Sequence, residues 1–508
     1  MSGNSSNKRI AKNAILLYIR TIIVLIISLY TSRLILKALG MEDLGIYNVV
    51  GGIVALMAFF RTSLSKATSR FITYKLGENA SDQSLCRIFS SAMTIHIIIA
   101  VIAVVLGETI GRFILEHWTD IPVNRQNAAF WIYQCALVIF CLQILTSPYE
   151  SIVIAQENMS VFAYMSILSS VLKLLIVYIL FVCSFDRLIL YGVLMVTMDA
   201  LILFIYFLYD KIKYPVFSFY FIWDNDYSKR IFAFSGWTLL GSSANAVTQQ
   251  GVGLLFNNFV GLIANTALGF ANQVNAAVLQ FVNSFQIAFN PQIIKLYAQG
   301  EVPKMHILLL RASKFSFILS YVLALPLIAN MGYILNIWLG VVPQYTIEFC
   351  QLILICCVID SLSGVFNTAI TATGNIKGFQ IGISLTFTLD LITASILLLC
   401  HLHPALVFGS RIMTRGLINM CIELYFVKKQ LAFDLCLYLK TVITPILITM
   451  LVTIPSVYIV CLYTEGITKL MVTTSITVIL LILSTYVIFL NKDEKIKFIS
   501  MASRLYKR

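Results

Sequence analysis

The sequence predicts an all-α, polytopic membrane protein with about fourteen transmembrane helices. Of its 508 residues, 59% are hydrophobic and only 12% are charged, and the mean hydropathy is +0.89. Apolar runs of about 20 residues recur along the whole chain, and each is long enough to cross a bilayer. No stretch has the composition of a folded soluble domain. The net charge of +13 is therefore interpreted as membrane topology, and no nucleic-acid partner is expected.

The predicted spans follow one another with short polar connections. The first span comes after a short basic N-terminus. It is too long for the apolar core of a signal peptide and lacks a cleavage site of small residues, so we expect it to be retained. The spans are expected at residues 14–38, 44–70, 86–110, 127–148, 160–184, 187–209, 229–257, 263–294, 306–330, 346–372, 378–401, 404–427, 437–463 and 468–490.

The distribution of Lys and Arg predicts that both termini are cytoplasmic. Most of the 36 basic residues fall in the N-terminus, the C-terminal tail and every second loop, which is the pattern of positively charged cytoplasmic segments. An even number of spans places both termini on that side. The connection 148–160 departs from the pattern, because it holds Glu150 and Glu157 and no basic residue.

A weak internal repeat predicts two six-helix halves. The second span opens with LGIYN at 44–48, and the eighth has LGFAN near its start at 268–272; each of these helices ends in Gly-Glu. Such repeats are typical of transporters whose site lies between the halves. The expected lobes are residues 1–209 and 229–428, joined by a cytoplasmic linker at 210–228. Residues 429–508 would hold the last two spans and a basic cytoplasmic tail.

Polar side chains line one face of several spans and suggest a polar cavity. Amides and hydroxyls are costly in hydrocarbon unless they find partners. Two interpretations remain open: hydrogen bonding between helices, or a hydrated lumen suited to sugar hydroxyls. The helical spacing on the seventh, eighth and tenth spans selects as lumen candidates Asn245, Gln249, Asn272, Asn275, Asn283 and Asn367.

Ionisable residues at membrane depth are the strongest functional candidates, since they persist there only when paired or hydrated. One interpretation is a set of internal ion pairs that hold helices together. The other is a cationic lumen for an anionic ligand, because basic residues outnumber carboxylates in the spans of the first half. The candidates for binding an anionic headgroup are Arg20, Arg61, Lys173, Arg411 and Arg415, although Arg20 and Arg61 lie near enough to the interfaces to reach water by snorkelling. The candidates for ion coupling are Asp199, Asp360 and Asp390.

Signatures of enzymes are missing from the sequence, so no catalytic residue, metal or cofactor is expected. There is no phosphate-binding Walker loop, no nucleophile elbow, and no His or Cys spacing typical of metal ligands. The 11 cysteines lie mostly in apolar segments and form no disulfide pattern. Without a nucleotide site, active transport would draw on an ion gradient, the membrane potential or a substrate gradient.

Several short motifs resemble those of a known transporter family. They are LGIYN at 44–48, the segment from Pro148 to Met159, FSGW at 234–237, and the segment from Pro291 to Gly300. In this order they are similar to motifs of the bacterial polysaccharide flippases (O-antigen and capsule, Wzx-type) of the multidrug/oligosaccharidyl-lipid/polysaccharide (MOP) exporter superfamily. The resemblance covers nearly the whole chain.

The resemblance implies a MATE-like fold with two six-helix lobes and two further C-terminal helices. It implies a flippase that moves an undecaprenyl-diphosphate-linked oligosaccharide across the bacterial plasma (inner) membrane by alternating access, for surface polysaccharide such as O-antigen of lipopolysaccharide, or capsule. Proton counter-transport is the coupling proposed for relatives. Membrane lipid, a polysaccharide polymerase and glycosyltransferases are the implied partners.

Two alternatives follow from the same sequence. A MATE-type multidrug antiporter of the superfamily would pump organic cations and would place carboxylates in its first or seventh span, where this chain has none. A non-transporting membrane scaffold of polysaccharide assembly would not require charges at mid-span, so neutral substitutions there would have no effect.

Overall fold

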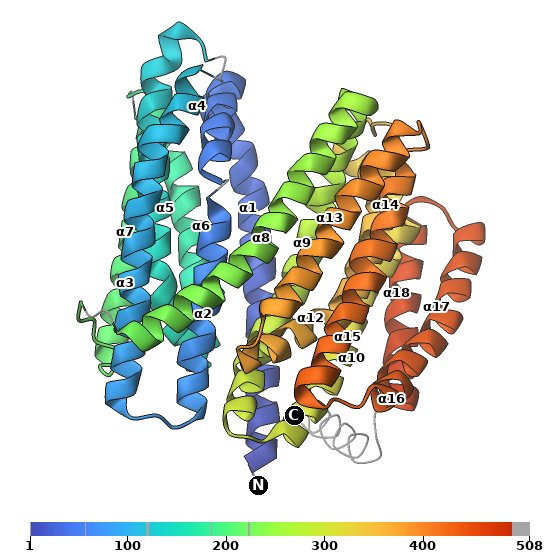
Figure 1. Ribbon diagram of the computed structural model, residues 1–508. Coiled ribbons are helices and arrows are strands. Elements are labelled where there is room, and N and C mark those ends of the chain that lie inside the picture. Colours follow the sequence, from blue (N-terminus) through green and yellow to red (C-terminus); the bar gives the residue numbers. More distant parts are fainter. Residues whose placement is uncertain (1, 56, 118–120, 184, 222–223, 490–508) are drawn as a thin grey trace, which may run out of the picture. The chain divides into compact units, whose positions relative to one another are not determined.

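The computed structural model describes residues 2–55, 57–117, 121–183, 185–221 and 224–489 (Figure 1). Within these ranges all regular structure is helical. The predicted basic tail after Phe489 lies outside the described residues. The helices are α1 (Ser2–Ala55), α2 (Ala58–Gly77), α3 (Asp82–Leu106), α4 (Arg112–His117), α5 (Gln126–Ala155), α6 (Met159–Val182), α7 (Arg187–Lys213), α8 (Asn225–Phe259), α9 (Leu262–Ala298), α10 (Val302–Ala329), α11 (Met331–Leu339), α12 (Thr346–Thr373), α13 (Lys377–Leu399), α14 (Ala405–Arg411), α15 (Asn419–Leu431), α16 (Leu435–Tyr438), α17 (Thr444–Tyr463) and α18 (Gly466–Ser484).

Short π-helical turns continue several of these helices without a break in direction. They join α3 to α4 (Gly107–Gly111), α14 to α15 (Ile412–Ile418) and α16 to α17 (Leu439–Ile443). A non-helical backbone at Gly40, with φ 80° and ψ 177°, divides α1 into two helices. This break falls between the first two predicted spans. Glycine suits the position, because it adopts a positive φ without the strain that other residues incur.

The helices confirm the predicted all-helical, multi-pass architecture. Ten helices of the described chain are long and apolar enough to cross a membrane. The remaining predicted spans (the second, seventh, eighth and twelfth) are also helical, in α1–α2, α8, α9 and α14–α15. Polar side chains such as Asn245 in α8 and Arg415 beside α15 lower their mean hydropathy. Length and hydropathy alone therefore miss these four helices, although other helices with charged residues, such as α12 and α13, are found.

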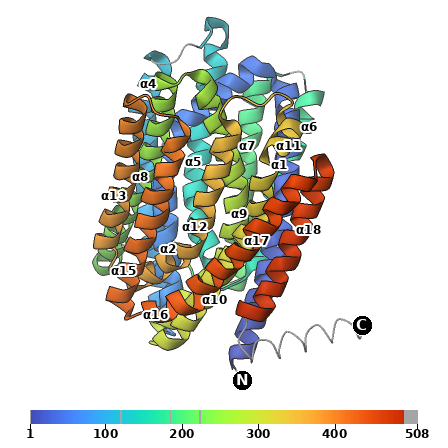
Figure 2. The same ribbon diagram turned by 90° about the vertical axis from the view of Figure 1, so that its right-hand side faces the viewer.

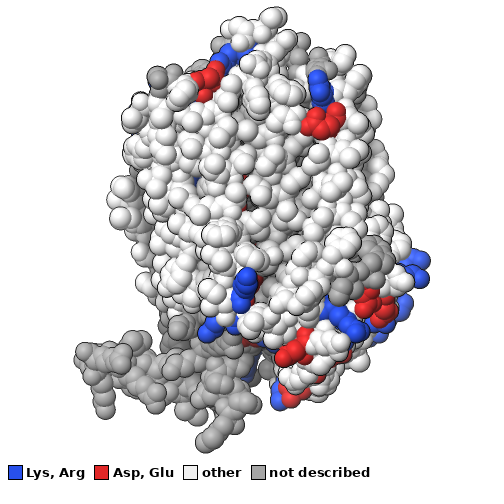
Figure 3. Space-filling view, turned by 90° about the vertical axis from the view of Figure 1, so that its left-hand side faces the viewer, with Lys and Arg blue, Asp and Glu red and all other residues white. Residues whose placement is uncertain are grey.

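The surface has the distribution of charge expected of a membrane protein. On the face drawn in Figure 3, basic and acidic side chains gather toward the top and bottom of the view, and the band between them is almost entirely free of charge. Figure 2 shows α17 and α18 running beside each other, and α17 exposes large apolar side chains such as Leu451 and Tyr458. Such surfaces are stable in contact with lipid.

The chain forms two compact units, each described here by itself. Unit 1 comprises residues 1–243 and 287–300, and unit 2 comprises residues 244–286 and 301–508. Each of α8 and α9 thus contributes one part to unit 1 and the other to unit 2. The lobe boundaries drawn from the sequence, at 210–228 and 428, stay a prediction.

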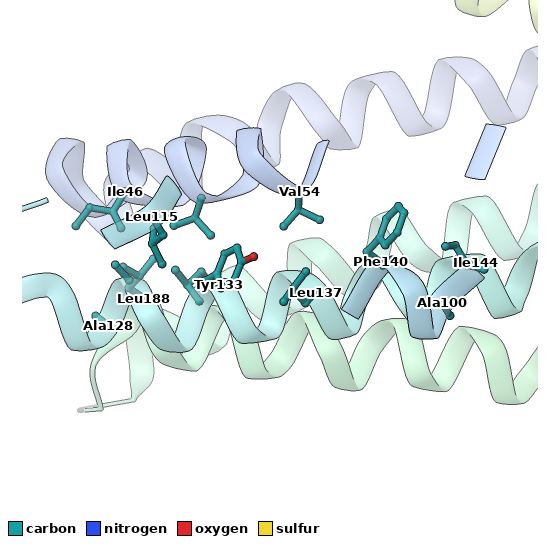
Figure 4. Close-up of a cluster of buried hydrophobic side chains, with 14 residues drawn as sticks. Ile46, Val54, Ala100, Leu115, Ala128, Tyr133, Leu137, Phe140, Ile144 and Leu188 are labelled. Atoms are coloured by element: carbon teal, nitrogen blue, oxygen red, sulfur yellow. The ribbon is translucent and has the colours of Figure 1, made fainter. Parts of the chain in front are cut away.

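Unit 1 is built around α5, which packs against α7, α2, α3 and α1. One of its cores contains buried residues of α1, α3, α4, α5 and α7 (Figure 4). The phenol of Tyr133, buried in this core, donates a hydrogen bond of 2.7 Å to the carbonyl of Gly107. The same carbonyl accepts the backbone N–H of Arg112, the i→i+5 bond of the π-helical turn, so Tyr133 adds a second hydrogen bond to it.

Helix α5 continues past Pro148 to Ala155, although the sequence places the end of that span at residue 148. The predicted connection 148–160 therefore shrinks to the turn at Gln156–Asn158, and Glu150 lies within a helix. Proline in a membrane helix is tolerated when neighbouring groups satisfy the freed backbone. The sequence-based interpretation of Glu150 as a loop residue is wrong for this reason.

Glu157, the other acidic residue of that predicted connection, joins three parts of unit 1. Its carboxylate accepts hydrogen bonds from Lys295 at 2.8 Å and Gln292 at 3.3 Å, both on α9. Its carbonyl accepts one from Asn13 of α1 at 3.3 Å. The connection needs no basic residue of its own, because Lys295 supplies the compensating charge.

Unit 2 is organised around α12, which packs against α10, α14, α15 and the turn Ile412–Ile418. Phe256, Phe349 and Phe408 pack together at one place, with ring centroids 4.5–6.0 Å apart. Helix α18 packs against α10 and α17. Aromatic and helix–helix packing hold α12 in place, and α12 carries Asp360.

We expect Gly77→Ala to destabilise unit 1. A Cβ added at Gly77 would lie 2.8 Å from the Cβ of Ala298 and 2.9 Å from the Cα of Lys295. Both neighbours are rigid, so overpacking should cost about 1–3 kcal/mol. The matched control is Gly236→Ala in α8, where an added Cβ meets nothing within 4 Å. Thermal unfolding of the purified protein measures both, and equal midpoints for the two variants would contradict the packing of α2 on α9.

Candidate functional site

In unit 1, two predicted site residues are joined through a glutamine. Arg61 of α2 donates a hydrogen bond of 3.0 Å to the side-chain oxygen of Gln143 of α5. The amide of Gln143 donates one of 3.1 Å to a carboxylate oxygen of Asp199 of α7. Gln143 thus orients a base and a carboxylate from different helices. Its amide group, which has both a donor and an acceptor, suits this position.

Arg61 lies deeper than the sequence suggests. Because α2 continues to Gly77, Arg61 is about 24 Å along the helix axis from that end at 1.5 Å per residue. The charge of Arg61 is compensated within unit 1, by its hydrogen bond to Gln143 and its electrostatic interactions with Asp199 and Glu150, so it does not need to reach water by snorkelling.

Lys173 of α6 lines a cavity within unit 1. The cavity has a volume of about 250 Å³ and lies among α1, α5, α6 and α7, with Gln143 and Tyr47 in its wall. The side chain of Lys173 is exposed and interacts electrostatically with Asp199. Since a water molecule occupies about 30 Å³ in the liquid, the cavity has room for several waters beside this ammonium group.

Arg20 of α1 completes the charged group of unit 1. It donates a hydrogen bond of 2.9 Å to the hydroxyl of Ser166 and lies 5.2 Å from the ring centroid of Phe162. Glu150 interacts electrostatically with both Arg20 and Arg61. The structure therefore gathers Arg20, Arg61, Lys173 and Asp199, which the sequence selects, and adds Glu150.

Lys66 of α2 is a further basic residue, which the sequence analysis did not select as a site candidate. It is exposed together with Thr62, one helical turn away. Lys66 lies about 16 Å along the axis from Gly77, and an ammonium group within a membrane helix requires water or a partner.

In unit 2, Asp390 of α13 forms a fully buried ion pair. Its carboxylate accepts hydrogen bonds of 3.2 Å from Nε of Arg411 and of 3.2 Å from the hydroxyl of Thr414. The side-chain exposures of Arg411 and Asp390 are 6% and 0%. Each charge is compensated by the other without any ligand, so these two candidates fit the interpretation as a structural ion pair.

Arg415, one turn after Arg411, has different surroundings. Its guanidinium donates a hydrogen bond to the side-chain oxygen of Asn245 and lies 4.5 Å from the ring centroid of Phe387. Gln249 donates to the same oxygen of Asn245 at 3.4 Å. Arg415 is half-buried, and it interacts electrostatically with Asp360 of α12. The structure thus brings together Asn245, Gln249, Arg415 and Asp360.

The polar stripe of α8 and α9 is divided between interhelical hydrogen bonds and exposed positions. Thr238 is buried in unit 1 and hydrogen-bonded to Ser63 of α2, which is interhelical contact. Farther along, Gln249 is exposed in unit 2. Of the other lumen candidates, Asn272 and Asn283 are exposed, and Asn275 and Asn367 are half-buried.

Sequence reasoning missed Gln143, Glu150, Lys66 and Glu423 as members of charged clusters. Glu150 was hidden by the assumption that α5 ends at its proline. Glu423 lies in α15 of unit 2, and a rule that every ionisable residue within a span is a candidate would have found it.

The chain is similar to solved structures of transporters, at low sequence identity. No protein-family model matches it, and no curated protein matches it. A crystal structure of a mutant MATE superposes with a TM-score of 0.73 at 12% identity, covering 84% of this chain and 96% of that chain. A MOP superfamily transporter from Pyrococcus furiosus superposes with a TM-score of 0.71 at 11% identity, covering 83% of this chain and 96% of that chain. A mutant MATE transporter from Vibrio cholerae superposes with a TM-score of 0.66 at 15% identity, covering 85% of this chain and 98% of that chain. The predicted MATE-like fold is confirmed.

Proposed function

We propose that this protein is a flippase that translocates an undecaprenyl-diphosphate-linked oligosaccharide across the bacterial plasma membrane by alternating access. The observation that carries the proposal is the excess of basic over acidic groups among the interacting side chains of unit 1. The bases of this group are Arg20, Arg61 and Lys173, and its carboxylates are Glu150 and Asp199. Lys66 adds a further, exposed base on α2 of the same unit. The net positive charge favours an anionic ligand.

A diphosphate headgroup matches the chemistry of these bases. Arginine binds phosphate oxygens through two parallel hydrogen bonds, and lysine contributes a compact charge. Lys173 lies beside a cavity and Lys66 is exposed, so neither ammonium group requires an internal ion pair to be stable. We assign the first contacts with the diphosphate to Lys66 and Lys173.

Unit 2 supplies groups suited to the sugars. Gln249, Asn272 and Asn283 are exposed on membrane helices. Each amide offers both donors and an acceptor, which is what the hydroxyls of a sugar require. Arg415 is connected to Gln249 because both donate hydrogen bonds to Asn245, and Arg415 interacts electrostatically with Asp360. We keep Asp199 and Asp360 as coupling residues and assign Asp390 and Arg411 to structural support.

A multidrug antiporter is the second candidate, and the carboxylates at membrane depth favour it. Glu150, Asp199, Asp360 and Glu423 could receive an organic cation or a coupling ion. Solved structures with this fold include a multidrug resistance MATE transporter in an outward-facing conformation. They also include a MOP transporter described as having a binding pocket of reverse polarity, which suggests a different function for it. Pocket polarity thus varies within the fold, and the excess of bases in this chain favours an anionic substrate.

Deletion of the gene in its host separates the candidates. A flippase deletion should remove surface polysaccharide and trap lipid-linked oligosaccharide in the membrane, and the wild-type gene should restore export. Unchanged polysaccharide with increased sensitivity to cationic drugs would establish the antiporter instead. Full export by variants with Lys66 and Lys173 both changed to Gln would favour the non-transporting scaffold.

We also expect both termini to face the cytoplasm. Reporters fused after Lys8 and within the connection that contains Tyr214 and Phe217 should therefore report the cytoplasmic side, because basic residues gather in these segments. A periplasmic signal from the second fusion would reverse the orientation of all later helices.

A further inference from the structure

Two buried oxygen atoms on α15 have no hydrogen-bond partner. One is Oε2 of Glu423, a residue that is only 3% exposed. The other is Oδ1 of Asn419, one helical turn earlier. Residues four apart lie on the same face of a helix, with Cβ atoms about 5–6 Å from each other. The two oxygens therefore belong to one polar spot in the interior of unit 2.

Other oxygen-bearing groups of α12 lie at the same spot. The hydroxyl of Ser363 forms a side-chain hydrogen bond with Glu423. The carboxylate of Asp360 lies close enough to interact electrostatically with Glu423. A carboxylate oxygen, an amide oxygen, a hydroxyl and a second carboxylate thus converge from two packed helices.

The basic residues nearby are already engaged. Arg411 is paired with Asp390 of α13, and Arg415 is bound to Asn245. From α16, Tyr438 interacts electrostatically with Glu423, and its phenol is hydrogen-bonded to Ser313 at 3.1 Å. No ion pair of Glu423 occurs among the residues that the structure describes. The carboxyl group of Glu423 is therefore without a compensating side chain.

An ionised carboxylate at Glu423 is costly in this interior, because no side chain of the described residues forms an ion pair with it. Desolvation of one buried carboxylate costs several kcal/mol, about what a single well-placed partner returns. The repulsion between Glu423 and Asp360 adds to this cost. Either a proton on Glu423 or a cation shared by the oxygens removes both penalties. Hard cations such as Na⁺ take carboxylate, amide and hydroxyl oxygens as ligands.

We propose that Glu423, with Asn419, Ser363 and Asp360, forms a binding site for one small monovalent cation, a proton or Na⁺. This proposal extends the proposed ion-coupled transport and adds to it a carboxylate that the sequence did not select. Because Asp360 also interacts with Arg415, occupation of the site changes the charge felt by the residues that face Asn245 and Gln249. The site thereby links a bound cation to the polar surface of unit 2.

Difference infrared spectroscopy on the purified full-length protein tests the proposal. Raising the pH without Na⁺, or adding NaCl in place of choline chloride at constant pH, should reduce the C=O stretching band of a protonated carboxyl. Within the titration range, each pH unit changes the protonated fraction of such a group by up to about tenfold. A response to pH alone identifies the proton, and release of the proton by Na⁺ identifies the metal ion.

Two variants and one control assign the band. It should be missing in Glu423→Gln and unchanged in Glu348→Gln, a control in the same unit whose side chain is 51% exposed. In Asn419→Leu, which leaves Glu423 in place, the band should shift, or about tenfold more Na⁺ should be needed for the same change. The proposal is overturned if no carboxyl band of the wild type responds to pH or Na⁺, or if Asn419→Leu and Glu423→Gln both reproduce the wild-type spectrum. The spectra are recorded without substrate, so they test the cation site independently of the proposed flippase function. If the Glu423 band responds as expected but the protein exports no polysaccharide, the cation site stands and only the flippase proposal fails.

Discussion

Asp390→Ala is expected to remove most of the protein from the membrane. The substitution leaves Arg411, whose side chain is 6% exposed, without its carboxylate. Thr414 also loses an acceptor at 3.2 Å. Breaking a buried ion pair on one side costs about 3–5 kcal/mol, which is a large part of the net stability of most folded proteins, about 5–15 kcal/mol.

The double variant Asp390→Leu with Arg411→Met is the matched control. Replacing both partners by apolar residues of similar size removes the stranded charge, so abundance should recover relative to Asp390→Ala. Quantitative blotting of membranes and thermal unfolding of the purified variants measure the effect. Normal abundance and stability of the single variant would mean that Arg411 finds another partner and that the pair is not structural.

Arg415→Ala is expected to have the opposite effect, although Arg415 lies only one turn from Arg411. Its side chain is half-buried and its partners, Asn245 and the ring of Phe387, are uncharged. Its removal therefore strands no carboxylate in a direct ion pair. We expect near-normal abundance and loss of polysaccharide export, and the same for Asp360→Asn.

The size of the export defect follows from the interaction that is lost. A hydrogen bond to a charged group contributes about 1.5–3 kcal/mol, so losing one contact with an anionic substrate should reduce affinity by roughly tenfold to a hundredfold. Arg415→Lys, which keeps the charge but not the forked geometry, should retain partial export. Disappearance of Arg415→Ala from the membrane, or undiminished export by it, would exclude Arg415 from the transport pathway.

The helices could be predicted from the sequence because lipid contact requires long apolar segments. Most of them stand out as apolar runs of this kind, and Gly40 ends the first where its φ of 80° requires glycine. The sequence misplaced the end of α5 because proline usually ends a soluble helix, whereas in this chain the helix continues to Ala155. That one error placed Glu150 in a loop, whereas it lies within helix α5 and interacts with Arg20 and Arg61.

The partners of the charged side chains could not be predicted, because they depend on helix packing between distant segments. Arg411 and Arg415 share a helical face in the sequence, yet one meets Asp390 and the other meets Asn245. Gln143 looked like one polar residue in an apolar span, and only the packing of α2 and α7 on α5 shows that it joins Arg61 to Asp199. The sequence identifies the charges that must be compensated, and the structure determines by what.

Binding of an anionic polyprenyl lipid tests the proposed function most directly. The purified protein in lipid nanodiscs would be titrated with undecaprenyl diphosphate and, separately, with undecaprenol, which has the same chain and no charge. We predict that the wild type binds the diphosphate at least about tenfold more tightly than undecaprenol, which corresponds to one charged contact. The double variant Lys66→Gln, Lys173→Gln should bind both lipids equally and keep the thermal stability of the wild type. Equal binding of the two lipids by the wild type, or competition by a lipophilic cation instead of by the diphosphate, would contradict an anion-binding site in unit 1.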